Sequence, residues 1–431
     1  MEQLTYSSLA DKIPYQPRVA DRVLLSRLSS GGAVLIEGPK ACGKTVTARR
    51  AALSEVLLDV DADARAAIDA GIPEVVLRGE TPRLIDEWQV VPELWNHIRR
   101  EIDARQADGQ FILTGSAVPA DDITRHTGAG RIARLRMRPM SLFESGHSSG
   151  AVSLGALFET PVLRATTTTL TVADLATRIA IGGWPANQVR ALTPALRAMR
   201  DYVEHLCRTD INRVGETTRS RSPDGVRRVI RSLARNVATT ATNKKITTDA
   251  TPPGGAMKEQ TTASYLDALE QLFVIENQLP WTPDLRSRAR IREAEKRHFV
   301  DPSIAVAALK ATPAELMTQP RFLGFLFESL VVRDLRVYAE PLDAEIFHYR
   351  DSNGLEVDAI VDAGEAGWGA IEVKLGQGAV NDATNALQRF AATIDQSLCG
   401  APRFLAVIVA TGAAYTRPDG VHVIPIGALG P

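Results

Sequence analysis

The sequence has 431 residues, of which 45% are hydrophobic and 23% charged, and its formal net charge at pH 7 is −1. This length and composition predict about two to four globular domains, and the charge excludes a general attraction of the whole chain to nucleic acid or anionic membrane. Three scattered cysteines, Cys42, Cys207 and Cys399, indicate neither a disulfide framework nor a zinc site and fit a reducing compartment. Because we find no signal-peptide core and no apolar run of membrane-spanning length, we expect a cytoplasmic protein.

The strongest motif begins where an apolar strand at Val34–Ile36 runs into a glycine-bounded loop. The pattern G-x-x-x-x-G-K-T between a strand and a helix is typical of a phosphate-binding loop. Its glycines let successive backbone N–H groups face a phosphate, and the helix N-terminus adds partial positive charge there. We predict that Lys44 contacts the β- and γ-phosphates of a nucleoside triphosphate and that Thr45 is a ligand of Mg²⁺. The predicted cofactor-binding residues of the loop are Gly38, Pro39, Lys40, Ala41, Cys42, Gly43, Lys44, Thr45 and Val46.

A second apolar strand, at residues 82–85, ends in Asp86 and Glu87. An acidic strand end is often only solvated, but its combination with the phosphate loop favours a functional interpretation. We predict that Asp86 holds the Mg²⁺ through water and that Glu87 is the general base that polarises the attacking water.

Further along, a strand at residues 110–116 ends in Thr114, Gly115 and Ser116, and arginines then alternate with apolar residues from Arg134 to Arg138. The alternation predicts a half-exposed strand whose arginines are mostly on the surface. We predict that Arg131, just before it, contacts the γ-phosphate, either in its own subunit or in a neighbouring one.

These motifs together resemble a large prokaryotic family of single-chain AAA-superfamily ATPases with a conserved C-terminal region of unassigned function. The resemblance rests on the phosphate loop, Leu84–Glu87, Leu113–Ser116 and the run from Arg138 to Glu144. It implies a parallel-sheet P-loop domain, ATP rather than GTP, and a γ-phosphate sensor at the strand end, for which Thr114 and Ser116 are the candidates. Capping of the turn at Gly115 is the alternative role of these two hydroxyls.

After a linker at residues 150–170, the pattern at 223–300 predicts a winged helix. An amphipathic helix near Val226–Val237, a short second helix, a third helix at 261–273 and a wing strand at 273–280 follow in order. Residues 219–235 contain six arginines and one aspartate. A second set of arginines alternates along the predicted wing, at Arg286, Arg288, Arg290 and Arg292. This clustering predicts contacts to a DNA backbone, although a solvated charged face is the alternative.

The C-terminal segment combines an apolar helix carrying Glu328, a strand with Asp358 and a strand with Glu372 and Lys374. This arrangement resembles the restriction-endonuclease-like nucleases. We predict that Asp358 and Glu372 bind a divalent metal, with Glu328 assisting through the metal or its waters. Lys374 would orient or activate the water and stabilise the developing charge. An E-x-K triplet also occurs on ordinary exposed strands, so a non-catalytic scaffold stays open as the alternative.

The whole sequence therefore predicts an α/β protein in three domains: an AAA-type P-loop ATPase domain at residues 1–150, a helical and winged-helix domain at 151–305, and a restriction-endonuclease-like domain at 306–431. The predicted cofactors are ATP and Mg²⁺, and the predicted activity is ATP hydrolysis coupled to DNA binding or processing. The alternative is a nucleotide-dependent switch whose C-terminal half binds a protein partner, for example in a toxin–antitoxin pair. A small-molecule kinase fits less well because no acceptor site follows the phosphate loop. The oligomeric state stays open.

Overall fold

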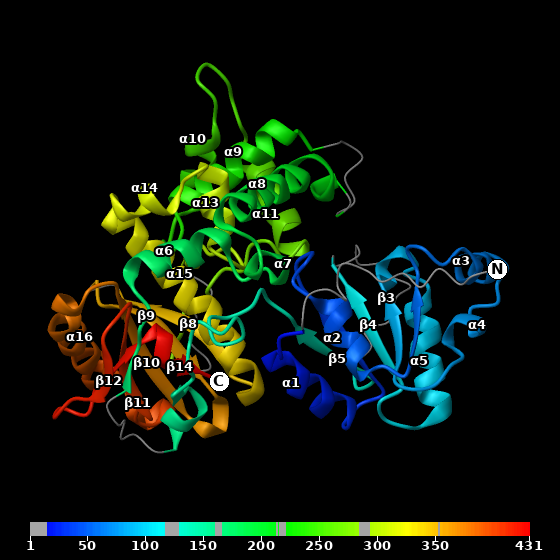
Figure 1. Cartoon of the computed structure of the whole chain (residues 1–431), viewed down its shortest axis with the longest axis horizontal. Coiled ribbons are helices and arrows are strands. Elements are labelled where there is room, and N and C mark those ends of the chain that lie inside the picture. Colours follow the sequence, from blue (N-terminus) through cyan, green and yellow to red (C-terminus); the bar gives the residue numbers. More distant parts are fainter. Residues whose placement is uncertain are drawn as a thin grey trace. The chain divides into compact units, whose positions relative to one another are not determined.

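The computed structural model describes residues 15–116, 129–159, 166–212, 214, 221–283, 294–351 and 354–431 (Figure 1). The chain forms two compact units. Unit 1 comprises residues 1–137 and 184–191, and unit 2 comprises residues 138–183 and 192–431. This division differs from the predicted three domains, because the first boundary lies at residue 137 rather than 150 and the middle and C-terminal segments form one unit.

The first boundary lies before residue 138 because the segment that follows is bonded within unit 2. The Met140 N–H donates to the Gly183 carbonyl at 2.6 Å, and the Ser148 hydroxyl donates to the Leu429 carbonyl at 2.6 Å. Backbone groups of this segment are thus satisfied by residues far away in the sequence, a requirement that local sequence patterns do not reveal.

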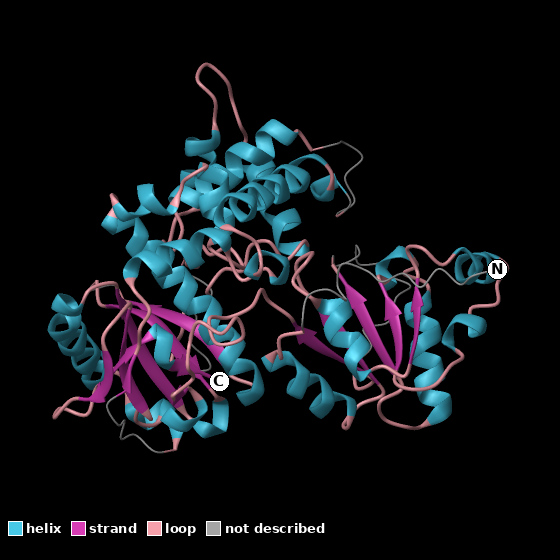
Figure 2. Cartoon of the chain, viewed as in Figure 1, coloured by secondary structure: helices cyan, strands magenta, loops and turns pink. Residues whose placement is uncertain are grey.

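Unit 1 is built on a parallel sheet whose five described strands have the order β2-β3-β4-β1-β5 (Figure 2). The strands are β1 (Ala33–Glu37), β2 (Ser54–Leu57), β3 (Arg83–Asp86), β4 (Phe111–Gly115) and β5 (Ile132–Arg136). The helices are α1 (Val19–Leu28), α2 (Lys44–Ala51), α3 (Ala62–Asp69), α4 (Glu74–Leu77), α5 (Leu94–Arg105) and α7 (Pro185–Gln188). The central strands are continuous apolar runs because helices cover such a sheet on its faces.

Helix α5 shows how the sequence produces this packing. Its apolar residues Leu94, Trp95, Ile98 and Ile102 recur at helical spacing, and all four are buried in one cluster with Phe111 of β4. This spacing is the pattern of an amphipathic helix on a sheet. The core of unit 1 therefore fixes β3 and β4 beside the phosphate loop strand.

Unit 2 contains a mixed sheet whose seven described strands have the order β7-β12-β13-β11-β10-β9-β8. The unit 2 strands are β6 (Val152–Ser153), β7 (Thr166–Thr167), β8 (Glu345–Arg350), β9 (Glu356–Asp362), β10 (Trp368–Lys374), β11 (Phe404–Val409), β12 (Ala413–Thr416), β13 (His422–Pro425) and β14 (Leu429–Gly430). Strands β8, β9 and β10 are antiparallel, whereas β10, β11 and β13 are parallel. The helix and strands that the sequence predicts around the acidic residues are present; the restriction-endonuclease-like designation of this sheet stays a prediction.

The helices of unit 2 form a helical part and also accompany the sheet (Figure 2). They are α6 (Val172–Ile181), α8 (Leu192–Arg208), α9 (Pro223–Arg235), α10 (Asn243–Ala250), α11 (Glu259–Gln271), α13 (Ser303–Leu309), α14 (Pro313–Met317), α15 (Pro320–Ala339), α16 (Val380–Thr393) and α17 (Gln396–Cys399). Helix α15 is buried over almost its whole length from Leu323 onward, as expected for a helix that is apolar on most sides.

After α9, α10 and α11, two extended segments pair antiparallel through Ile275 with Phe299 and Gln278 with Lys296. This is the element order predicted for a winged helix, and that designation also stays a prediction. The first segment continues as a parallel neighbour of β8, where the Trp281 N–H donates to the His348 carbonyl at 2.7 Å. The middle segment is thereby joined to the edge of the C-terminal sheet, which explains why no boundary falls at residue 305.

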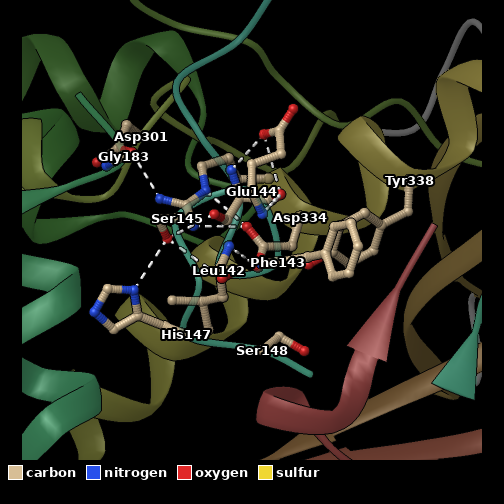
Figure 3. Close-up of polar contacts among 12 residues, drawn as sticks. Leu142, Phe143, Glu144, Ser145, His147, Ser148, Gly183, Asp301, Asp334 and Tyr338 are labelled. Carbon is tan, nitrogen blue, oxygen red and sulfur yellow. Dashed lines mark hydrogen bonds and ion pairs between the residues drawn. The ribbon is translucent and has the colours of Figure 1, made fainter. Parts of the chain in front are cut away.

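The run from Arg138 to Glu144 is held in unit 2 by a buried ionic network (Figure 3). Arg333 lies 2.8 Å from Asp301 and 2.6 Å from Asp334, and all three side chains are at most 2% exposed. The Leu142 N–H donates to the second oxygen of Asp334 at 3.0 Å. The network thus binds the backbone of the Arg138–Glu144 segment directly.

The charges in this network are two carboxylates against one guanidinium. Backbone donors supply the remaining stabilisation, because Gly183 N–H and Ser303 N–H each donate to Asp301 at 2.9 Å. Buried charges are tolerated when they are paired and hydrogen-bonded in this way. The result is a polar cluster in which removing one member leaves the others unsatisfied.

The arginines between 134 and 138 differ from the predicted surface strand. Strand β5 ends at Arg136, and only Arg134 is well exposed. Arg138 is largely buried and pairs with Glu276 at 2.7 Å and Glu340 at 3.3 Å. Burial alone would lower the pKa of Arg138, but these two carboxylates raise it above its ordinary value. Arg138 is therefore a structural ion-pair residue of unit 2, which period-two alternation could not distinguish from a surface arginine.

Candidate functional site

The phosphate loop joins the carboxyl end of β1 to the N-terminus of α2. Gly38 has φ +155°, and a Cβ atom there would lie 2.0 Å from the Met137 carbonyl oxygen. Gly43 has φ +106° and is the N-cap of α2. Both positions thus require glycine, one for space and both for backbone conformation. The sequence motif therefore reflects the geometry that lets this loop curl around an anion.

Lys44 and Arg18 fix the loop from two sides. Lys44 is 5% exposed, and its ammonium donates to the carbonyls of Gly38 at 3.0 Å and Pro39 at 2.9 Å. The buried Arg18 guanidinium donates to the carbonyl of Cys42 at 2.9 Å. The positive charge of Lys44 thus lies inside the loop, where a phosphate would be bound.

Two hydroxyls from different elements converge on one carboxylate beside the loop. The Thr45 hydroxyl of α2 donates to Asp86 Oδ1 at 2.8 Å, and the Thr114 hydroxyl of β4 donates to the same oxygen. The backbone N–H of Glu87 donates to the Thr114 hydroxyl at 3.2 Å. Because β1, β3 and β4 are parallel, their carboxyl ends meet at one edge of the sheet, and this brings the four residues together.

Glu87 follows Asp86 in an unusual conformation. Its φ is +54°, in the left-handed region that residues other than glycine rarely adopt. The carboxylate accepts a hydrogen bond from the Gln89 amide and one from the Ser116 hydroxyl at 3.3 Å. The two hydroxyls of the β4 end thus have separate partners, Thr114 with Asp86 and Ser116 with Glu87.

A second cluster of charges lies in unit 2. Lys374 contacts Glu372 at 2.5 Å and Asp358 at 3.3 Å, and Lys296 contacts Glu328 at 2.6 Å and Asp358 at 3.3 Å. We call these five residues the acidic centre. Strand pairing explains the proximity of two of them, because Ala359 of β9 is opposite Ile371 of β10 and the next positions along are Asp358 and Glu372. The structure therefore brings together all four residues that the sequence predicts here, and it adds Lys296.

Burial shifts the ionisation of the acidic centre. Burial, with a smaller contribution from the negative charge of Asp358, raises the pKa of Glu328 to about 7 and that of Glu372 to about 8. Burial would also raise the pKa of Asp358, but the two lysines lower it below its ordinary range. Burial alone would lower the pKa of Lys296 and Lys374, yet the carboxylates beside them raise it. Asp358 is thus the carboxylate that the lysines most strongly keep ionised.

Comparison with known proteins bears on both units. Residues 30–145 match the model of an AAA domain. Residues 30–145 are a P-loop domain of the AAA superfamily. Residues 172–315 and 323–429 match two domains of unknown function, DUF8612 and DUF4143. The C-terminal region that follows the AAA domain is therefore one to which no function is assigned.

Two solved structures resemble the chain weakly. The Walker-type ATPase PABY2304 of Pyrococcus abyssi is 14% identical with a TM-score of 0.43, over 67% of this chain and 94% of that one. A DNA replication initiation factor is 15% identical with a TM-score of 0.23, over 58% of this chain and 86% of that one. No curated protein sequence matches the chain. Among the helices of the described residues, none is long and apolar enough to cross a membrane.

The donors around Asp86 fit the Mg²⁺ that AAA domains use with ATP. The Thr45 hydroxyl and the Asp86 carboxylate are hard oxygen donors, they already share a hydrogen bond, and they lie beside the loop that encloses Lys44. The residues present at this edge therefore fit a metal-bound nucleoside triphosphate.

The structure does not bring Arg131 to the phosphate loop. Its carbonyl accepts a hydrogen bond from Ala33 N–H at the start of β1, whereas the loop follows the end of that strand. Because β1 rises about 3.3 Å per residue, its length places Arg131 roughly 17 Å from the phosphate loop. The Arg131 side chain instead pairs with Asp103 at 2.8 Å on the surface. Only the contact to a neighbouring subunit stays a prediction for Arg131.

Sequence reasoning missed two polar residues that touch the predicted site. Arg18 lies just before α1, and no motif distinguishes it from the other arginines of that region; its contact to the Cys42 carbonyl is long-range. Gln89 lies two residues after Glu87, and that proximity is a signal that could have been used. Both act on groups that the sequence did identify.

The acidic centre does not fit a divalent metal as its residues lie. Among the described residues, no group of three or more His, Cys, Asp or Glu side chains is arranged to hold a metal ion. The space between Glu328 and Asp358 contains the Lys296 ammonium, and the other oxygen of Asp358 accepts from Val373 N–H at 2.9 Å and from Lys374. Both Asp358 oxygens are thus bonded within the protein.

Among the residues that the structure describes, several of the arginines predicted to contact DNA are engaged inside unit 2. Arg227 pairs with Glu204 at 2.9 Å, Arg231 donates to the Ala308 carbonyl at 3.3 Å, and Arg221 is buried. Arg286, Arg288, Arg290, Arg292 and Arg219 lie outside the described residues. Helix α11, at the position predicted for a recognition helix, carries Glu259, Asp267 and Glu270 and no basic residue. The exposed basic residues that the structure describes on and beside helices α9, α10 and α11 include Arg235, Lys244, Lys245 and Lys258.

Proposed function

We propose that the AAA domain binds ATP with Mg²⁺ and hydrolyses it. The observation that carries this proposal is the convergence of the Thr45 and Thr114 hydroxyls on Asp86 Oδ1, beside a loop whose backbone encloses the Lys44 ammonium. A carboxylate that is merely solvated at a strand end needs no hydroxyl donors from two other elements, whereas Asp86 has both. The cluster has the groups that phosphoryl transfer uses for positioning and charge stabilisation.

Each residue then has a separate role. Lys44 would exchange its bonds to the loop carbonyls for bonds to the phosphates. Thr45 and Asp86 would hold a metal ion, which would supply charge neutralisation. Glu87 accepts a proton from the attacking water. Ser116 and Gln89 orient the Glu87 carboxylate, and Thr114 fixes both the Asp86 carboxylate and the backbone of Glu87.

The binding step is tested by replacing Lys44 with Ala. We expect ATP affinity to fall roughly 10- to 150-fold, because a charged hydrogen-bond donor is worth about 1.5–3 kcal/mol. Titration of the full chain with a fluorescent ATP analogue measures it. The matched control is Arg49→Ala, which removes a cation that is 40% exposed on the same helix and pairs only with Glu55 among the ion pairs described. Equal affinities for wild type and Lys44→Ala would contradict the proposal.

For unit 2 we propose the scaffold role that the sequence left as the alternative to DNA processing. The observation in its favour is Lys296, which neutralises Glu328 and Asp358 where a nuclease requires a metal ion. The acidic face of α11 also argues against phosphate contacts there. Hydrolysis in the AAA domain would then act on a protein partner of unit 2. Duplex DNA incubated with the chain and Mg²⁺ should stay intact, and cleavage that Lys374→Ala abolishes would favour the nuclease instead.

A further inference from the structure

Lys296 is held rigidly in the acidic centre. Its backbone makes two hydrogen bonds with Gln278, both of 2.9 Å, and its side chain is 8% exposed. The buried Gln278 amide in turn donates to the carbonyl of Phe347 at 2.8 Å and to that of Asp358 at 3.0 Å. The strand that carries Lys296 is therefore bonded, through Gln278, to the same residue that the Lys296 ammonium contacts.

The two lysines divide the carboxylates of the centre between them. Lys296 lies between Glu328 of α15 and Asp358 of β9, and Lys374 lies between Asp358 and Glu372 of β10. Lys296 has few alternative positions because it is almost completely buried, whereas the Lys374 side chain is 31% exposed. Lys296 is thus the more buried of the two lysines, and it lies outside α15, β9 and β10, which carry the three carboxylates.

We infer that the Lys296 ammonium takes the place of a divalent cation, so that this one residue keeps the acidic centre free of metal. This inference rests on the proposed scaffold role of unit 2. Removing the Lys296 charge makes the acidic centre more negative by one unit, and it empties the position between the oxygens of Glu328 and Asp358. Carboxylate oxygens are the ligands that Mn²⁺ and Mg²⁺ prefer.

The test is Mn²⁺ binding to the nucleotide-free full chain, followed by electron paramagnetic resonance. Wild type should show no Mn²⁺ binding that depends on Asp358, so Asp358→Asn should leave its titration unchanged. Lys296→Met, which keeps an unbranched side chain of similar length, should gain about one Mn²⁺ equivalent that Lys296→Met/Asp358→Asn loses. Mn²⁺ should also raise the melting temperature of Lys296→Met and not that of wild type, because a ligand stabilises the state that binds it.

Lys374→Met is the matched control, because it removes the same charge and leaves Lys296 between Glu328 and Asp358. It should gain no Mn²⁺, and a gain equal to that of Lys296→Met would show that net charge rather than position excludes the metal. If Lys296→Met folds but gains no Mn²⁺ binding, the inference is overturned while the scaffold proposal stands. If Lys296→Met does not fold, the wild-type titration decides, since Mn²⁺ binding that Asp358→Asn abolishes would overturn it. Metal-dependent DNA cleavage by wild type would instead overturn the scaffold proposal itself.

Discussion

Replacing Arg333 with Met lowers the free energy of unfolding of unit 2 by about 3–5 kcal/mol, the cost of removing one partner from a buried ion pair. Asp301 and Asp334, both fully buried, would lose their shared cation and face each other's charge through the vacated space. Burial already raises the pKa of Asp334 above its ordinary value even with Arg333 present. Urea unfolding of the variant measures the loss, read from a probe in unit 2 such as Trp281 or Trp368.

The control for this prediction is Arg321→Met on the same helix, α15. Arg321 is exposed, and surface substitutions usually change the free energy of unfolding by no more than about 0.5 kcal/mol. If Arg333→Met were as stable as Arg321→Met, the network would not be what fixes the Arg138–Glu144 segment.

Replacing Glu87 with Gln lowers kcat for ATP hydrolysis by about 10²–10⁴-fold, the range over which a positioned general base contributes. The substitution keeps the size of the side chain and its ability to accept from the Ser116 hydroxyl, so the local structure and ATP binding should persist. Phosphate release under saturating ATP measures kcat, and titration with the fluorescent analogue confirms that binding is kept.

Glu93→Gln is the matched control, since Glu93 is an exposed glutamate at the start of α5 in the same unit. Its kcat should match that of wild type. If Glu87→Gln retained wild-type kcat, or if both variants lost activity equally, Glu87 would not be the general base.

The sequence was most informative where function depends on local pattern and on parallel strands. A glycine-bounded loop between strand and helix predicts its own conformation, and Gly38 and Gly43 have the positive φ values it requires. Because parallel strands end at one edge of a sheet, the predicted strand ends at Asp86 and Thr114 had to lie close together, as they do. The roles assigned to these side chains in hydrolysis stay predictions.

Long-range pairing accounts for what the sequence could not indicate. Lys296 comes from a charged stretch with no periodic signal, and only the pairing of its strand with Gln278 carries it to Asp358. The Arg333 network joins the segment at Leu142 to helix α15, much later in the chain. The sequence therefore could not predict the boundary at residue 137. Arg131 was placed from its sequence neighbours alone, without the strand register that puts it at the far end of β1.

The measurement that tests the central proposal most directly is phosphate release from ATP by the wild-type chain, with Mg²⁺ and with the metal chelated, alongside Glu87→Gln. The proposed centre of Lys44, Thr45, Asp86 and Glu87 predicts turnover that requires Mg²⁺ and is nearly absent in Glu87→Gln. Bound ATP without turnover, or turnover that persists equally after chelation of the metal, would contradict it.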